Sequence, residues 1–247
     1  MEMYEEKLAR LSQMLLAAKR AVFFGGAGVS TESGVPDFRS RDGLYNQQWR
    51  YPPETILSHE FFVRRTEEFY RFYRQKLLFP DARPNAAHLA LAKLERTGHL
   101  DTVITQNIDG LHQAAGSRRV VELHGSVLRS RCVRCGRRFE GMEPVLCSTE
   151  PVPHCACGGV IKPDVVLYGE SLKEEDIENA ALAIERADLL IIGGTSMSVY
   201  PAAGFVQGWT GPLIVLNRTP TPMDGRADLL ITEPIGQALG AAVAGMD

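Results

Sequence analysis

The sequence has no long hydrophobic run, no excess of basic residues and no cysteine outside positions 132–157. A helix that crosses a bilayer needs about 20 apolar residues, so we expect no membrane partner. The formal net charge of −3 gives no electrostatic reason to expect a nucleic-acid partner. Residues 1–6 are acidic and lack the basic start and apolar centre of a signal peptide, so we expect a cytoplasmic protein.

The length and composition fit a globular α/β protein. The 247 residues suffice for one larger domain with a small insertion, and 45% of them are hydrophobic. Helical and strand patterns alternate, which predicts a parallel, doubly wound sheet. The predicted strands are residues 21–24, 101–105, 120–123, 188–192, 212–216 and 228–231. The predicted helices are residues 4–19, 60–78, 85–97, 173–187 and 234–244.

A glycine-rich stretch follows the first predicted strand. Small residues at positions 25–28 let a backbone approach a phosphate group closely. The fingerprint of an ordinary dinucleotide turn is incomplete, since Thr31 stands in place of its third glycine and Pro36 discourages an immediate long helix. A glycine-rich turn can be just a turn. The acid, aromatic and arginine at positions 37–39, however, favour a ligand-binding loop.

Polar or glycine residues also follow four other predicted strands. In a doubly wound sheet, the carboxyl ends of the strands form the crevice where ligands bind. Asn107 and Asp109 could instead cap a helix that begins at Leu111. A histidine in such a crevice, as at position 124, can titrate near neutral pH. The convergence of these strand ends predicts a large nucleotide ligand. The residues concerned are Gln106, Asn107, Asp109, His124, Gly194, Thr195, Ser196 and Asn217.

All five cysteines lie in one stretch that is rich in proline and glycine and interrupts the α/β pattern. An odd, clustered set in a cytosolic-looking chain indicates metal binding rather than disulfides. The best set of four thiolates is Cys132, Cys135, Cys155 and Cys157. Four thiolates leave a zinc ion no open position, so the predicted zinc is structural. One spacing in this set is a residue short, and Cys147 and His154 stay open as substitutes.

With these segments identified, the chain resembles the sirtuin family, the NAD-dependent protein deacylases. The similarity runs from about Ala21 to the last predicted helix. The motifs that carry it are Gly-Ala-Gly-Val-Ser with Gly-Val-Pro-Asp-Phe-Arg, Thr-Gln-Asn-Ile-Asp-Gly-Leu-His, Glu-Leu-His-Gly, Lys-Pro-Asp-Val-Val-Leu-Tyr-Gly-Glu and Gly-Gly-Thr-Ser. The units it implies are a Rossmann-like NAD-binding domain (1–40, 85–128 and 163–247), a cofactor loop with the helical part of a small domain (41–84) and a zinc-binding module (129–162).

The resemblance implies that NAD binds in the cleft between the two domains. The residues implied near its phosphates and nicotinamide are Gly26, Ala27, Gly28, Thr31, Asp37, Phe38 and Arg39. Those implied at the nicotinamide ribose and carboxamide are Gln106, Asn107, Ile108 and Asp109. Those implied at the adenosine half are Gly194, Thr195, Ser196, Asn217 and, by a weaker match, Gln237.

The implied reaction converts acetyl-lysine and NAD to lysine, nicotinamide and 2′-O-acetyl-ADP-ribose, and nicotinamide is expected to inhibit as a product. Asn107 and Asp109 would fix the cofactor in a dry pocket, and His124 would act as general base on a ribose hydroxyl. The acyl-lysine protein would add as a strand between two chain edges. The residues implied at these edges are Val165, Val166, Leu167, Tyr168, Val199 and Tyr200.

One departure from the family pattern narrows the acyl group. Members that prefer succinyl- or malonyl-lysine carry a Tyr-x-x-Arg pair. In this chain the residue three positions after Tyr70 is Tyr73, so the arginine is missing. An anionic acyl tail therefore lacks its bidentate partner. We expect neutral acyl groups, acetyl first, with longer or lactyl groups left open. Mono-ADP-ribosyl transfer, NAD hydrolysis and a non-catalytic NAD-sensing scaffold are the alternative functions.

Overall fold

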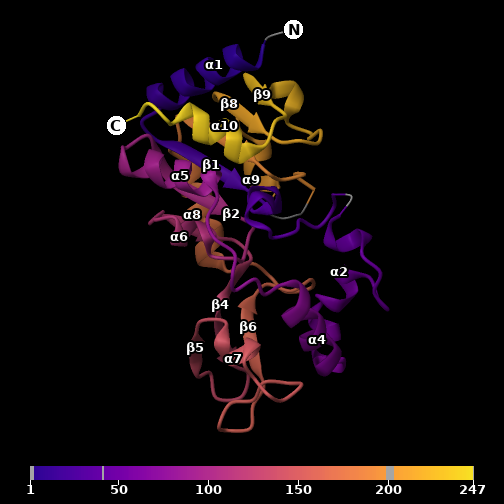
Figure 1. The fold of residues 1–247 in the computed structure, drawn as a ribbon. Helices are drawn as coiled ribbons and strands as arrows, with labels where there is room; N and C mark the ends of the chain where they lie inside the picture. Colours follow the sequence, from indigo (N-terminus) through magenta and orange to yellow (C-terminus); the bar gives the residue numbers. More distant parts are fainter. Residues whose placement is uncertain (1–2, 41, 199–202, 247) are drawn as a thin grey trace.

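The computed structural model describes residues 3–40, 42–198 and 203–246, which form a large and a small lobe (Figure 1). The large lobe contains a six-stranded parallel sheet in the order β3-β2-β1-β7-β8-β9. Its strands are β1 (Ala21–Gly25), β2 (Leu100–Thr105), β3 (Val120–Glu122), β7 (Leu189–Gly193), β8 (Leu213–Leu216) and β9 (Leu229–Ile231). This is the strand order of a dinucleotide-binding Rossmann sheet, and the predicted α/β class is confirmed.

Helices cover both faces of the large sheet. One face carries α1 (Tyr4–Ala17), α5 (Ala86–Arg96) and α10 (Ile235–Ala242), and the other carries α8 (Glu174–Glu185) and α9 (Gly204–Gln207). Phe23 and Phe24 of β1 are both fully buried and belong to the two opposite apolar cores. Because both faces are covered, the strands read as apolar runs without alternation. In the described part of the chain, no helix is both long and apolar enough to span a membrane.

The small lobe joins an antiparallel sheet to a group of short helices, seen below and to the right of the large lobe in Figure 1. Its strands, in the order β5-β4-β6, are β4 (Gly125–Cys132), β5 (Arg138–Glu140) and β6 (Ile161–Val165), with α7 (Glu143–Leu146) beside them. Its helices are α2 (Pro53–Ile56), α3 (His59–Arg64) and α4 (Thr66–Lys76). Buried Phe69 and Phe72 of α4 share one apolar core with Val127 and Val165 of the sheet.

The single long helix predicted over residues 60–78 is wrong, because the structure has two helices there. The chain leaves helical geometry at Arg65, where φ is −137° and ψ is 50°. Ser58 caps the first of the two helices by accepting the N–H of Phe61 at 3.1 Å. Neither glycine nor proline occurs between residues 60 and 78, so the sequence carries no local breaker that marks this break.

Short connections complete the fold around the predicted ligand loop. The four 3₁₀ turns of the described residues are Ala27–Val29, Thr31–Ser33, Leu44–Asn46 and Asp224–Arg226. Two of them follow β1 directly, where an ordinary dinucleotide-binding turn would start a long helix. The expectation from Pro36, that no long helix begins here, is therefore met.

Candidate functional site

Two glycine-bearing loops meet where the strand order reverses between β1 and β7, the place where such sheets bind ligands. The N–H of Gly26 donates to the carbonyl of Gly193 at 3.2 Å, and that of Gly28 donates to Gly194 at 2.8 Å. A Cβ on Gly28 would lie 2.8 Å from the Cα of Gly194, whose own φ is +58°. Glycine is therefore required for the loops to touch.

Ser30 links the polar residues next to these loops. Its Oγ donates to Oδ2 of Asp109 at 2.6 Å and accepts from Nδ2 of Asn107 at 3.1 Å. The structure thus brings Asn107 and Asp109, from the end of β2, to the loop that follows β1. Sequence reasoning missed Ser30. The available signal was a hydroxyl residue directly after a glycine-rich turn, a position able to bond with residues from the next strand.

Two buried histidines lie behind Ser30. Nε2 of His88 is 3.5 Å from its Oγ, and the rings of His88 and His112 are 4.8 Å apart. Burial, with a smaller contribution from His88, lowers the pKa of His112 to about 3, so its ring is neutral at physiological pH. Nδ1 of His88 accepts the N–H of Asn85 at 3.3 Å. This contact gives His88 a structural role at the start of α5.

His124 stands at the junction of the two lobes, between β3 and β4. Its Nδ1 lies 3.0 Å from the carbonyl oxygen of Gln106. A carbonyl can only accept, so Nδ1 carries the proton and Nε2 keeps its lone pair. Burial lowers the pKa of His124, despite the bond to Gln106, and this favours the neutral ring. The side chain is half-buried and has the form that a general base requires.

Several residues expected at the two ends of NAD follow the carboxyl ends of β2, β7 and β8. Nε2 of Gln106 donates to Oγ1 of Thr195 at 3.0 Å, which joins the ends of β2 and β7. Asn217 is buried after β8, and its Nδ2 donates to the carbonyl of Thr219 at 2.7 Å. Ser196 shares a hydroxyl–hydroxyl bond with Ser198. The ends of β2, β7 and β8 thus present polar groups at one edge of the sheet, with β1 between β2 and β7.

Thr31 and Gln237 flank the glycine loop. Oγ1 of Thr31 donates to the carbonyl of Gly28 at 3.0 Å, and Gln237 is exposed near the start of α10. Glu32, which sequence reasoning missed, accepts the N–H of Gly236 at 2.8 Å and so ties α10 to this loop. An acid at a helix start satisfies a free N–H and the helix dipole.

Residues 37–39 begin the loop that leads to the small lobe. Oδ1 of Asp37 accepts the N–H groups of Arg39 and Ser40 at 2.9 and 2.7 Å, so this carboxylate holds its own turn. Phe38 packs edge-on against Tyr45, and the Arg39 guanidinium lies 5.4 Å from the centre of the same ring. Tyr45 is therefore the aromatic anchor of the predicted cofactor loop.

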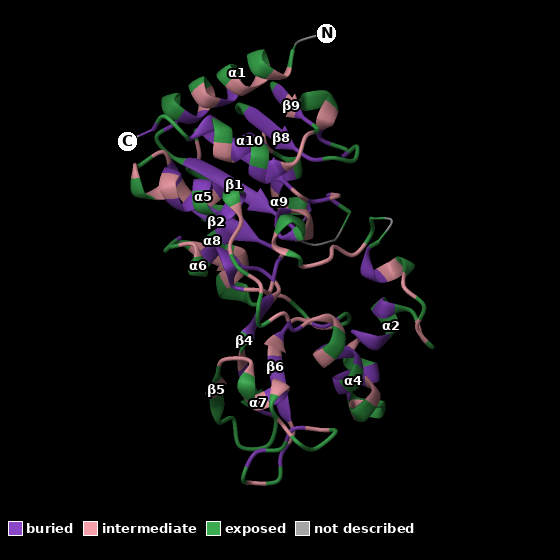
Figure 2. Ribbon diagram, in the orientation of Figure 1, coloured by how far each residue is buried: buried purple, intermediate pink, exposed green. Residues whose placement is uncertain are grey.

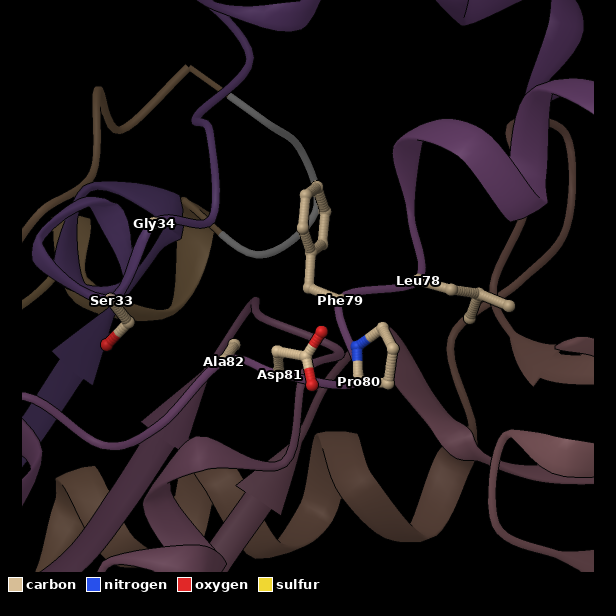
Figure 3. Close-up of a pocket in the computed structure, with 7 residues that line it drawn as sticks. All are labelled: Ser33, Gly34, Leu78, Phe79, Pro80, Asp81 and Ala82. Carbon is tan, nitrogen blue, oxygen red and sulfur yellow. The ribbon is translucent and has the colours of Figure 1, made fainter.

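A surface pocket of about 290 Å³ lies beside the glycine loop (Figure 3). Ser33, Gly34 and residues 78–82 line it, and none of the residues expected to contact NAD does. Ser33 accepts a hydrogen bond from Nδ2 of Asn85 at 3.0 Å. In Figure 3 the ring of Phe79 stands at one side of the pocket and Asp81 at another. The residues of the polar network at the strand ends do not line this pocket.

The segment expected to bind the substrate continues from β6. The N–H of Val166 donates to the carbonyl of His124 at 2.9 Å. The N–H of Tyr168 donates to Leu57, and its carbonyl accepts from His59, both at 2.9 Å. The Tyr168 hydroxyl lies 2.6 Å from that of Tyr45, so the segment contacts the predicted cofactor loop. Val199 and Tyr200, expected on the opposite edge, lie outside the described residues.

Ile108 connects the crevice to the core of the small lobe. Its carbonyl accepts the N–H of Val127 at 2.9 Å, and its side chain packs against that core. The Ala27 carbonyl accepts from the N–H of Ser30 at 3.1 Å, which closes the first turn after the glycines. Both residues therefore contribute mainly backbone bonds that fix the site's shape.

The tip of the small lobe gathers four cysteines. The Sγ atoms of Cys132, Cys135, Cys155 and Cys157 all lie within 4.8 Å of one another. Four sulfurs around a tetrahedral zinc ion, each about 2.3 Å away, lie about 3.8 Å apart, so this donor set fits zinc. Cys147 is exposed and outside the group, and His154 bonds instead to Glu150 at 2.9 Å. The shortened second spacing is thus accommodated without a substitute ligand.

Tyr70 and Tyr73, which stands where the Tyr-x-x-Arg pair has its arginine, are both buried in the small lobe. The Tyr70 hydroxyl donates to the carbonyl of Ile161, which fastens α4 to β6. Tyr73 is fully buried and stacks on Phe69 with ring centres 5.5 Å apart. Burial raises the pKa of both tyrosines, so neither position carries a charge at neutral pH.

The fold and this crevice define a dinucleotide-binding α/β protein with a thiolate-bearing second lobe. The model of the Sir2 family matches residues 26–201. The chain belongs to the Sir2 family. It is 51% identical over 242 residues to a protein of Clostridium acetobutylicum, covering 96% of this chain and 98% of the relative. It is 52% identical over 235 residues to a protein of Cutibacterium acnes, covering 94% and 96%. Both relatives are named NAD-dependent protein deacetylase.

Solved structures agree with this assignment. One holds a Sir2 protein with a p53 peptide and NAD⁺, with a TM-score of 0.84 and 37% identity over 99% of this chain and 98% of that one. Another holds Sir2Tm bound to a propionylated peptide, with a TM-score of 0.84 and 37% identity over 96% and 98%. At these identities and scores the similarity extends over both lobes.

Proposed function

We propose that this chain is an NAD-dependent protein-lysine deacetylase. The observation that carries the proposal is His124, at the junction of the lobes and beside the strand ends of a Rossmann sheet. Its ring is favoured in the neutral form, and its Nε2 accepts no hydrogen bond from the described residues. Relatives about half identical over nearly the full length carry that name, which supports the same activity. The products are lysine, nicotinamide and 2′-O-acetyl-ADP-ribose.

NAD supplies a ribose carbon that accepts the acyl oxygen as nicotinamide leaves. The residues present fit this group because the glycine loop and the polar strand ends lie where the strand order reverses, the place where such sheets bind nucleotides. Asn107 and Asp109, held by Ser30, orient the nicotinamide ribose and carboxamide. Gln106, Thr195 and the other crevice residues named above hold the rest of the cofactor. Nicotinamide inhibits because it leaves from and returns to the same pocket.

His124 takes the proton of a ribose hydroxyl at Nε2. The carbonyl of Gln106 fixes the tautomer and the orientation of the ring, so the lone pair points away from that bond. The lowered pKa keeps the ring unprotonated near neutral pH. A histidine in this state supplies general-base catalysis without a charged group in the crevice.

The acyl-lysine peptide adds as a strand along Val165–Tyr168. The buried, uncharged tyrosines Tyr70 and Tyr73 favour a neutral acyl group, acetyl first. The zinc ion held by the four cysteines shapes the module at residues 129–162 and takes no part in the reaction. The enzyme acts in the cytoplasm, without nucleic acid or membrane.

Mass spectrometry of an acetyl-lysine peptide, incubated with the protein with and without NAD, tests this function. We expect a loss of the acetyl mass only with NAD, together with O-acetyl-ADP-ribose. NAD consumption with the peptide still acetylated would instead indicate an ADP-ribosyltransferase or glycohydrolase. If NAD binds and neither compound changes, with acetyl or other acyl peptides, the chain is an NAD-sensing module.

A further inference from the structure

A buried ion pair lies directly behind the segment that the proposed function assigns to the peptide. Nζ of Lys162 is 3.1 Å from Oε2 of Glu170 and donates to the carbonyl of Val165 at 3.0 Å. Lys162 is only 7% exposed, which is rare for a lysine. Burying a charged group costs free energy unless the charge is paired and hydrogen-bonded.

Glu170 collects several donors around one turn. Its Oε2 also accepts the N–H of Leu167 at 3.0 Å, and its Oε1 lies 2.8 Å from Nδ1 of His59. Its own N–H returns to the carbonyl of Leu167 at 2.9 Å. Gly169 between them has a φ of +88°, so the turn cannot be a regular strand. The carboxylate therefore fixes where the segment stops being extended.

The remaining backbone groups of the segment are almost all occupied. Val166 and Tyr168 use their N–H groups on His124 and Leu57, and the carbonyls of Leu167 and Tyr168 are also bonded. Lys162 occupies the carbonyl of Val165. The carbonyl of Val166 accepts no hydrogen bond from the described residues. It is the group this segment leaves for an incoming strand.

We propose that Lys162 and Glu170 are a positioning pair that holds the Val166 carbonyl in register for the substrate peptide. This inference rests on the proposed deacetylase function and names residues that act through the backbone, without touching the reacting atoms. Lys162 fixes the residue before Val166, and Glu170 fixes the residue after it. The pair therefore sets the affinity for the peptide. The affinity for NAD does not depend on it.

Steady-state kinetics with an acetyl-lysine peptide and NAD test the pair. For Lys162→Met we expect the peptide KM to rise about ten-fold or more, with kcat and the NAD KM changed less than about two-fold. Lys162→Arg keeps the positive charge, so we expect its peptide KM to lie close to the wild-type value. Lys173→Met is the matched control, because Lys173, just before α8, makes a more exposed ion pair at 2.8 Å with Asp164, which lies on the same strand as Lys162.

A second variant separates positioning from mere stability. A single buried charge left without its partner destabilises a fold, whereas removal of both charges relieves that cost. We therefore expect Lys162→Met/Glu170→Gln to recover the melting temperature lost in Lys162→Met but not the peptide KM. Recovery of both, or equal KM values for Lys162→Met and Lys173→Met, overturns the proposal. A wild-type protein without NAD-dependent deacetylation overturns the proposed function itself.

Discussion

Every residue of β1 and β7 in the large lobe is buried, whereas β5 in the small lobe exposes Arg138 and Glu140 (Figure 2). The apolar cluster around the four cysteines contains only Cys132, Cys155 and Ile161 as buried members. The large lobe can thus hold its fold by burying apolar surface, which is the main driving force of folding. The tip of the small lobe cannot, and it needs a metal ion and polar anchors.

The largest expected effect comes from removing a zinc ligand. Cys132→Ser should release zinc and unfold the tip of the small lobe, because three thiolates hold the ion poorly and little core remains beneath it. NAD should still bind to the large lobe. Elemental analysis, hydrogen exchange and calorimetric NAD binding measure the three effects. Full zinc content and unchanged melting would show that the ligand set is wrong.

The next effect concerns the junction between the lobes. His124→Ala should lower kcat by about 10²- to 10⁴-fold, because a positioned general base contributes that much. Neither lobe should lose its fold, and the affinity for NAD should stay within about two-fold. Single-turnover deacetylation and calorimetry check these outcomes. A near-normal rate would falsify the base assignment.

Acid should act on the large lobe through His112. Its pKa is about 3 in the folded protein and about 6.5 in an unfolded chain, so the unfolded state binds more protons between these values. Stability is therefore complete above about pH 6.5 and falls as pH decreases toward 3. In His112→Phe the free energy of unfolding should fall by about 1 kcal/mol less per pH unit than in the wild type. Urea unfolding at pH 7 and pH 5 gives the free energy of unfolding of both proteins. An equal loss of free energy between the two pH values in wild type and His112→Phe would contradict the assignment.

The smallest effect tests a polar anchor of the small lobe. The guanidinium of Arg74 donates to the carbonyls of Val145, Glu150 and Pro151 at 2.8–3.0 Å and so ties α4 to the zinc module. Arg74→Met should weaken this attachment by about 1 kcal/mol, since each such bond contributes modestly. Hydrogen exchange at residues 145–151 measures it. Arg71→Met, at an exposed position of the same helix, is the control and should leave exchange unchanged.

The sequence predicted most of the large lobe and less of the small one, for a physical reason. Buried strands of a parallel sheet are continuous apolar runs, and their carboxyl ends are marked by glycine and polar residues, as at Phe24 and Thr105. The break between α3 and α4 has no such mark. It arises where α2, α3 and α4 pack around a shared core, and tertiary packing of this kind overrides a helical pattern.

The candidate site divides in the same way. Asn107, Asp109 and His124 could be found because they directly follow strands. Ser30 and Lys162 were missed because their partners come from distant parts of the chain or from a turn that no pattern predicts. Gly26 and Gly28 were predicted from the approach of a phosphate. The sequence does not show that a second loop also packs against them.

The bond between the carbonyl of His124 and the N–H of Val166 has a mechanical consequence. It ties the residue proposed as base directly to the segment proposed to receive the peptide. A hinge motion that opens or closes the two lobes carries both together, so their alignment is settled when the chain folds. In each turnover the cofactor and the peptide then align on a base and a peptide-binding segment that are already held together.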